Sequence, residues 1–260
     1  MILNDVKKIA IPEGEVTKIT DSSGNVIWIK PSTSLYRRLE YIHFNGAEYI
    51  QTDIYAGTPG HNFICEFTVE DTPTDTLSAR TLLGVYDTSV SDTLRRFYLA
   101  WRGPNGIRAS IGNVWSNYAT DFSLNDKLKV NMTYNKNGSY PRGYWQLSNI
   151  TTDTSIGSAN PLAVTAVGDL NTEAYLKLGC QVSSNGNASN FWLGKIYSFQ
   201  RRQGNSSGTL THNYIPCQRK SDNVCGIYDT INNTFIPMTG TTITSDAAGP
   251  VVDEDWNLQA

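Results

Sequence analysis

The chain has 260 residues, of which 39% are hydrophobic and 11% aromatic, and its formal net charge at pH 7 is −3. This length can bury a continuous core, and the 21 glycines together with few strong helix formers favour strands joined by turns over helices. Lysine and arginine are scattered, which argues against a nucleic-acid-binding surface, and no apolar run approaches the ~20 residues that a membrane-spanning helix needs.

The first 31 residues predict a small unit of their own. Two runs rich in β-forming residues, 16–20 and 26–30, flank a turn-forming pentad at 21–25, which is typical of a β-hairpin. An isolated hairpin is only marginally stable in water, so we expect it to pack on the rest of the chain, on a second copy or on another protein. The apolar side chains that it offers for this contact are Ile19, Val26, Ile27 and Trp28. The segment before it lacks the apolar core of a signal peptide, so we expect a soluble protein made in a cytoplasm.

Residues 35–240 predict one antiparallel β-sandwich. Hydrophobic residues alternate with a period of two in the runs 63–67, 97–101, 107–111 and 128–134, as in half-buried strands. Segments with turn chemistry separate these runs, at 57–60, 103–106, 135–143 and 183–190. Short strands at this spacing favour an all-β sandwich or jelly roll. The last segment, 244–260, is acidic and has little periodicity, which predicts a C-terminal tail whose Trp256 can dock on a neighbour.

The four cysteines predict buried thiols rather than a metal site. Cys65 and Cys180 continue the apolar faces of their strands, and no pair has the Cys-x-x-Cys spacing that zinc sites use. Cys217 and Cys225 flank a polar turn, so a disulfide across that turn is an alternative to two free thiols in a reducing cytosol. No dense aspartate cluster indicates calcium, and we expect no metal and no other cofactor.

Enzyme chemistry finds little support in the sequence. Glycoside hydrolases place two carboxylates about 5 to 9 Å apart, for example at alternate positions of one strand, and no strand here carries such a pair. A Gly-x-Ser-x-Gly motif is also missing, and His43, His61 and His212 lie in no recognisable catalytic context. The sequence therefore predicts a protein that is not an enzyme.

One loop has the composition of a carbohydrate-binding site. Sugars offer apolar C–H faces and many hydroxyls, so their sites combine exposed aromatic rings with amide or carboxylate groups. Segment 112–121 interleaves the two kinds of residue, with Trp115 and Tyr118 beside Asn113, Asn117 and Asp121. The alternative is that the two aromatic rings cap the edge of the sandwich, because large aromatics usually find a packing role.

Two segments resemble a known module. Residues 39–54 (LEYIHFNGAEYIQTDI) resemble the opening strand pair of the concanavalin A-like (LamG-like) β-sandwiches found in tail, fibre and other virion proteins of phages and prophages of gut bacteria. Residues 213–237 resemble its closing segment, in which a strand ending in Ile-Pro-Cys runs through a charged turn into a Gly-Ile-Tyr-Asp hairpin. The resemblance spans about 35–240; its two ends are specific, and its middle is generic.

This resemblance implies a non-enzymatic structural protein of a phage virion, made in the bacterial host cytoplasm and displayed as a head fibre, decoration or tail-fibre component. The implied partners are other virion proteins, reached through the hairpin as an attachment segment, and copies of the chain itself in a homotrimer. A host surface glycan is a further partner if the sandwich aids adhesion, whereas we expect no nucleic-acid binding and no membrane insertion. Two alternatives remain open because one fold serves many functions: a lectin as the main function, and, with less support, a glycan-degrading enzyme.

Overall fold

The computed structural model describes residues 18–20, 26–29, 34–55, 60–71, 79–86, 96–102, 105–111, 114–116, 119–134, 143–162, 175–182, 188–240, 245–254 and 256. The chain divides into two compact units, Met1–Ser34 and Leu35–Ala260. The predicted N-terminal hairpin is confirmed: β1 (Lys18–Thr20) pairs antiparallel with β2 (Val26–Ile29), and Ile19 lies opposite Trp28. The side chains of Ile19, Val26, Ile27 and Trp28 lie outside the described part, so their role in attachment stays a prediction.

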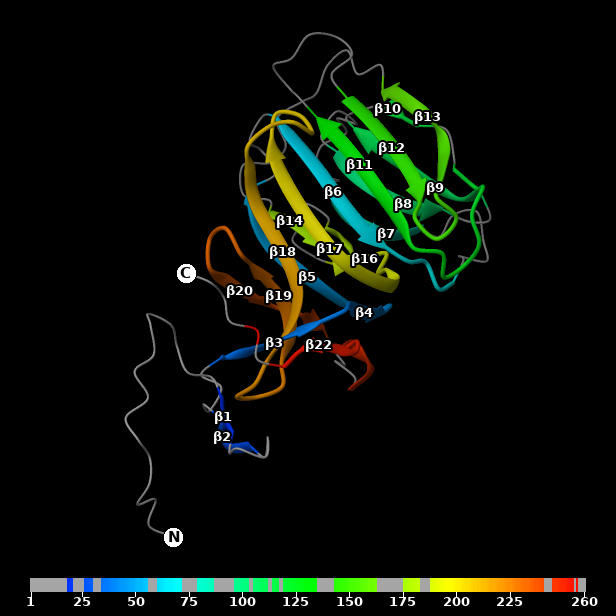
Figure 1. Ribbon diagram of the computed structural model, residues 1–260. Helices are drawn as coiled ribbons and strands as arrows, with labels where there is room; N and C mark the ends of the chain where they lie inside the picture. Colours follow the sequence, from blue (N-terminus) through cyan, green and yellow to red (C-terminus); the bar gives the residue numbers. More distant parts are fainter. Residues whose placement is uncertain are drawn as a thin grey trace, which may run out of the picture. The chain divides into compact units, whose positions relative to one another are not determined.

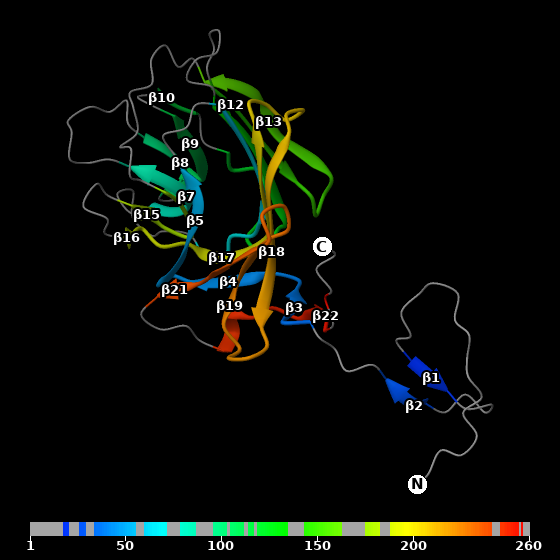
Figure 2. The ribbon, with the colours of Figure 1, turned by 90° about the vertical axis from the view of Figure 1, so that its left-hand side faces the viewer.

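The larger unit is an antiparallel β-sandwich, as the sequence predicts (Figures 1 and 2). Its smaller sheet has the strand order β10 (Val114–Trp115), β9 (Ile107–Ile111), β8 (Arg96–Arg102), β7 (Ala79–Tyr86), β14 (Tyr175–Leu178), β5 (Glu48–Tyr55) and β21 (Thr239–Gly240). Its larger sheet has the order β13 (Thr154–Leu162), β12 (Gly143–Asn149), β11 (Leu128–Tyr134), β6 (His61–Phe67), β17 (Leu193–Gln203), β18 (Leu210–Arg219), β19 (Cys225–Asp229) and β20 (Thr234–Pro237).

Shorter elements complete the larger unit. In the larger sheet β4 (Ile42–Asn45) pairs with β17, and β3 (Tyr36–Leu39) pairs with β18 and with β22 (Val251–Asp253). A separate pair is formed by β15 (Gln181–Val182) and β16 (Ala188–Ser189). A short 3₁₀ turn, η2, spans Ser245–Ala247, and no helix among the described residues has the length and apolarity to cross a membrane.

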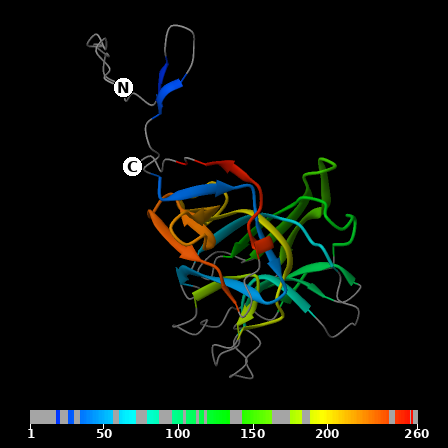
Figure 3. The ribbon, with the colours of Figure 1, turned by 90° about the horizontal axis from the view of Figure 1, so that it is seen from below.

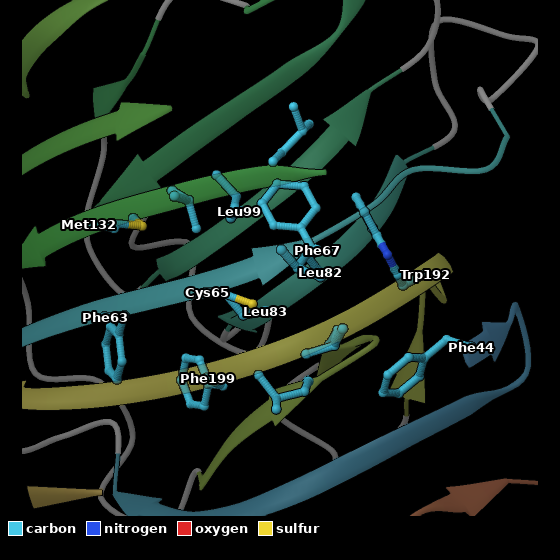
Figure 4. Close-up of a cluster of buried hydrophobic side chains, with 14 of the residues drawn as sticks. Phe44, Phe63, Cys65, Phe67, Leu82, Leu83, Leu99, Met132, Trp192 and Phe199 are labelled. Carbon is cyan, nitrogen blue, oxygen red and sulfur yellow. The ribbon is translucent and has the colours of Figure 1, made fainter. Parts of the chain in front are cut away.

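The core lies between the two sheets and follows from the period-two alternation. Phe63, Cys65 and Phe67 project from β6 into this core and are essentially unexposed (Figure 4). The ring of Phe63 lies 5.2 Å from that of Phe97 in the smaller sheet and 5.6 Å from that of Phe199 on the neighbouring β17. Aromatic pairs at such distances stabilise a core beyond the burial of their area, so these contacts tie the two sheets together.

The resemblance motif at 39–54 has a structural explanation in the turn between β4 and β5. Gly46 has a φ of +94°, a conformation that costs glycine little. The carboxylate of Glu48 is fully buried, and its Oε2 accepts hydrogen bonds from the backbone N–H groups of Asn45, at 2.9 Å, and Ala47, at 3.3 Å. The sequence Asn-Gly-Ala-Glu therefore forms a turn in which the glutamate carboxylate accepts hydrogen bonds from the turn's own backbone.

The segment expected to be a C-terminal tail contributes to the larger sheet over part of its length. In β22, Val251 lies opposite Leu39 of β3, and Figure 3 shows this strand, in red, beside β3. Trp256 then packs edge-on against Tyr228 of β19, with 5.6 Å between the ring centroids. Backbone pairing thus orders this segment without the apolar alternation that would reveal it in the sequence.

The cysteines are all free and buried, in agreement with the prediction of buried thiols. Cys225 lies opposite Gln218 on the neighbouring strand, whereas Cys217 lies opposite Gly226. Because successive residues of a strand point to opposite faces, Cys217 and Cys225 lie on different faces of the hairpin and cannot form the disulfide across the turn. Burial raises the pKa of Cys180 to about 12, as expected for an unreactive thiol.

Candidate functional site

The outer face of the larger sheet carries a row of amide side chains. Since Phe63, Cys65 and Phe67 point into the core, the alternate residues of β6 and their cross-strand partners point outward. Strand register places one outward residue from each of five strands in a single row: Gln146, Asn131, Ile64, Gln200 and Asn213. The five strands run side by side in Figure 1, and at about 4.8 Å between neighbours the row spans about 19 Å.

The next row of the same face adds an aromatic ring and further polar groups. It consists of Tyr144, Thr133, Asn62 and Arg202 on β12, β11, β6 and β17. Tyr144 is 44% exposed, whereas Asn62 is fully buried. The two rows together are called the amide face: Asn62, Ile64, Asn131, Thr133, Tyr144, Gln146, Gln200, Arg202 and Asn213.

Hydrogen bonds within the amide face fix the orientation of its amides. Asn62 Nδ2 donates to Asn131 Oδ1 at 2.6 Å and to Thr133 Oγ1 at 2.8 Å. Gln200 Nε2 donates to Asn213 Oδ1 at 3.0 Å, and Asn213 Nδ2 donates to Thr230 Oγ1 at 2.8 Å. These bonds use the oxygen of Asn131 and the nitrogen of Gln200, so their remaining amide atoms are oriented by the protein.

Several of these remaining groups have no protein partner within the described residues: Asn131 Nδ2, Gln200 Oε1 and the whole amide of Gln146. An amide nitrogen donates and an amide oxygen accepts, so the face offers both functions in fixed positions. With the exposed ring of Tyr144 beside them, these amides have the chemistry that recognises a hydroxyl-rich ligand with apolar C–H faces.

Glu66, a carboxylate on this outer face, forms two ion pairs. Glu66 lies beyond the amide row on β6, with its Oε2 3.0 Å from Lys127 Nζ and its Oε1 3.6 Å from Lys129 Nζ. Lys127 also lies over the ring of Tyr197, 4.3 Å from its centroid. The two lysines therefore balance the negative charge of Glu66.

A second group of polar side chains lies between the sheets, where β5 meets β18 and β19. Asp53, His212 and Asp229 each offer one ligand atom, and these atoms all lie within 4.8 Å of one another. Burial lowers the pKa of His212 despite the two carboxylates nearby, and burial raises the pKa of Tyr214, whose hydroxyl donates to Asp53. The sequence analysis missed this pair of carboxylates because it looked for alternate positions of one strand, whereas Asp53 and Asp229 come from different sheets.

Asp229 is held by its own turn. It is fully buried; its Oδ1 accepts from the backbone N–H groups of Asn213, at 3.0 Å, and Ile231, at 2.9 Å, and its Oδ2 accepts from Asn232 Nδ2 at 2.6 Å. A carboxylate that is fully buried and accepts three hydrogen bonds from the protein holds the turn together and is closed to a substrate.

The loop predicted to bind carbohydrate falls mostly outside the described residues. The backbone of Trp115 is part of β10 and pairs with Ser110 of β9, whereas the side chain of Trp115 and all of Asn113, Asn117 and Tyr118 are not described. Asp121 is exposed. The assignment of this loop to sugar binding therefore stays a prediction.

Sequence reasoning did not find the amide face. Its only signal was the recurrence of amide residues at alternate positions of several runs, such as Asn131 in 128–134 and Gln146 in 143–149. Alternation tells which residues share a face of one strand, but not which strands are neighbours.

Several solved structures are similar to this chain. The chain is similar to a candidate carbohydrate-binding protein from Bacteroides ovatus, with a TM-score of 0.52 and 13% identity, covering 78% of this chain and 59% of that one. It also resembles the CBM40 module of the Ruminococcus gnavus IT-sialidase, with a TM-score of 0.42, 13% identity and coverage of 62% of this chain and 88% of that one. A third is tailspike protein 2 of the Escherichia coli O157:H7 bacteriophage CAB120, with a TM-score of 0.46, 13% identity and coverage of 67% and 27%.

No protein-family model and no curated protein sequence matches the chain. The chain spans 59% of the length of the Bacteroides protein. At 13% identity, the similarity to that protein establishes a shared β-sandwich fold.

Proposed function

We propose that the sandwich is a non-enzymatic carbohydrate-binding module and that its ligand is held on the amide face. The observation that carries this proposal is the set of oriented amide groups without protein partners, on Asn131, Gln146 and Gln200, beside the exposed ring of Tyr144. The row is about 19 Å long, which is longer than a single sugar ring. The ligand class that we propose is therefore an oligosaccharide or polysaccharide. The fold shared with a candidate carbohydrate-binding protein supports the same function.

The absence of catalysis is part of the proposal and has its own support. Two of the carboxylates described above are engaged by the protein: Glu66 is neutralised by Lys127 and Lys129, and Asp229 is buried under three hydrogen bonds. Neither is free to protonate a glycosidic oxygen or to attack a sugar carbon.

The biological setting that we propose is a phage virion. The resemblance of residues 39–54 and 213–237 to virion sandwiches supports a structural protein displayed as a head fibre, decoration or tail-fibre component. In that setting the glycan is a polysaccharide of the host surface, the copies form a homotrimer, and the N-terminal hairpin attaches the sandwich to other virion proteins.

The test is binding of the full chain to arrayed bacterial polysaccharides, followed by titration of the best ligand against point variants. Tyr144→Ala and Gln146→Ala should each weaken binding by about 1 kcal/mol, or about fivefold, because each removes one contact to the sugar. Tyr175→Ala is the matched control, since this tyrosine of the smaller sheet is 43% exposed, almost the same as Tyr144. Loss of binding in the control but not in the two variants would refute the amide face as the site.

A further inference from the structure

Three side chains of metal-ligating type converge from three strands of the two sheets. Asp53 comes from β5, His212 from β18 and Asp229 from β19, and their ligand atoms lie within 4.8 Å of one another. In a tetrahedral site with metal–ligand bonds of about 2.0 to 2.2 Å, two ligand atoms lie about 3.3 to 3.6 Å apart. Side-chain movements that shorten the longest separation by about 1 Å would therefore complete a coordination shell.

The two ring nitrogens of His212 have different surroundings. Nδ1 lies 3.1 Å from the hydroxyl oxygen of Thr211, which also lies 3.1 Å from the backbone carbonyl of Arg201 and accepts from Arg201 Nη1 at 3.2 Å. Nδ1 is therefore engaged by its own strand, and Nε2 is the ring nitrogen that is left to bind a metal.

The other ring nitrogen lies beside a carboxylate. Nε2 of His212 is 3.8 Å from Oδ1 of Asp53, which also accepts the hydroxyl of Tyr214, and within the described residues no hydrogen bond reaches Nε2. Two ligand atoms of one tetrahedral ion lie about 3.3 to 3.6 Å apart, so a cation that binds both atoms requires only a small movement of these two side chains.

We propose that Asp53, His212 and Asp229 bind a divalent transition-metal ion between the two sheets. One imidazole and two carboxylates suit zinc or another first-row ion, whereas calcium and magnesium prefer oxygen ligands alone. Asp53 is 41% exposed and gives the ion access from solvent. Three ligands leave the remaining positions to water.

The surrounding groups support this assignment. The hydrogen bonds to Asp229 from its own turn hold one carboxylate in place, and the bond from Tyr214 holds the other. Arg201 is a cation close to the site, and it donates through Nε to His61 Nδ1, at 2.8 Å, and through Nη1 to Thr211 Oγ1, at 3.2 Å. With a neutral imidazole, the two carboxylates and one guanidinium sum to a charge of −1, which attracts a dication.

The experiment uses the full chain, stripped with a chelator and titrated with zinc, manganese or calcium chloride by calorimetry, with the melting temperature recorded in parallel. We expect one zinc ion per chain and a higher melting temperature, because the ligands come together only in the folded state. Asp53→Asn and His212→Gln should each weaken zinc binding at least tenfold. His43→Gln should bind zinc as the wild type does, because His43 is a half-buried histidine whose Nε2 is bonded to Glu70, at 2.7 Å, away from the site.

Three results would overturn the proposal: no zinc binding by the stripped chain, equal zinc affinity in Asp53→Asn and His212→Gln, or tighter binding of calcium than of zinc. Nuclear magnetic resonance of His212 in the metal-free chain separates the remaining alternative. An imidazolium that persists at pH 7 and is not displaced by zinc would mean that a proton fills the gap between Nε2 and Asp53.

Discussion

Tyr214 of β18 donates its phenolic hydrogen to the carboxylate of Asp53 on β5, which links the larger sheet to the smaller one. The ring of Tyr214 is fully buried and stacks on Phe199, at 5.7 Å, which in turn stacks on Phe63, at 5.6 Å. Three neighbouring strands therefore contribute to one aromatic column, and the hydroxyl at its end is satisfied by the opposite sheet. Burial and the bond to Asp53 both raise the pKa of Tyr214, so the hydroxyl keeps its proton.

Tyr214→Phe should lower the free energy of unfolding by about 1.5 to 3 kcal/mol, the usual range for a hydrogen bond to a charged group. The ring and its stacking remain, so the loss reports the hydroxyl alone. Urea denaturation followed by fluorescence measures it. Tyr175→Phe, which changes a 43% exposed hydroxyl, is the control and should stay within about 0.5 kcal/mol of the wild type. Equal midpoints for Tyr214→Phe and the control would mean that the bond to Asp53 contributes nothing to stability.

Glu70 should make the stability of the sandwich depend on pH in the acid range. Burial raises the pKa of Glu70, but hydrogen bonds from Lys195 and His43 lower it further than burial raises it, so the folded-state pKa lies below its usual value. Its Oε1 is 3.0 Å from Lys195 Nζ, and its Oε2 is 2.7 Å from His43 Nε2. The stabilisation is therefore complete above the unfolded-state pKa near 4.3 and is lost as the pH falls through the lower folded-state pKa.

Denaturation curves of Glu70→Gln between pH 3 and pH 6 check this expectation. The variant should be less stable than the wild type at pH 6, and the difference should shrink towards pH 3. Glu40→Gln, which alters an exposed carboxylate, provides the reference. A difference that stays constant over this range would show that the charge of Glu70 is not what stabilises the fold.

The sequence predicted the individual strands better than it predicted which strands lie side by side in the sheets. The alternation of Phe63, Cys65 and Phe67 correctly indicated a half-buried strand, because side-chain period depends on the strand alone. The amide face and the Asp53–His212–Asp229 cluster depend on which strands pair and in which register, and these are set by contacts between segments far apart in the chain. Single-sequence patterns carry little of that information.

Removal of residues 1–31 should leave a folded sandwich that no longer incorporates into particles. The larger unit, Leu35–Ala260, is a compact unit in its own right. A hairpin as short as β1 and β2 needs a partner to bury its apolar residues, and the virion is the partner that we propose. The truncated chain should show a strand-dominated circular dichroism spectrum and an unchanged melting temperature. Normal incorporation of this chain would refute the attachment role.

Trp115 tests where the carbohydrate site lies. Its backbone belongs to β10, in the smaller sheet, whereas the amide face lies on the larger one. Because the amide face already supplies the groups that a sugar needs, we expect the ring of Trp115 to pack at the sandwich edge. Trp115→Ala should then cost about 3 to 5 kcal/mol of stability, the usual cost of truncating a buried tryptophan. Glycan affinity of the fraction that remains folded should match that of the wild type.

A sugar-binding role of Trp115 would be distinguished by the same variant, because stacking on a sugar needs an exposed ring and packing at the sandwich edge needs a buried one. If Trp115→Ala weakens polysaccharide binding while the melting temperature stays unchanged, the loop at 112–121 belongs to the glycan site. The double variant Trp115→Ala with Tyr144→Ala then decides whether the two places act together. Additive losses would indicate two independent subsites, whereas a loss no larger than that of either single variant would indicate one shared ligand contact.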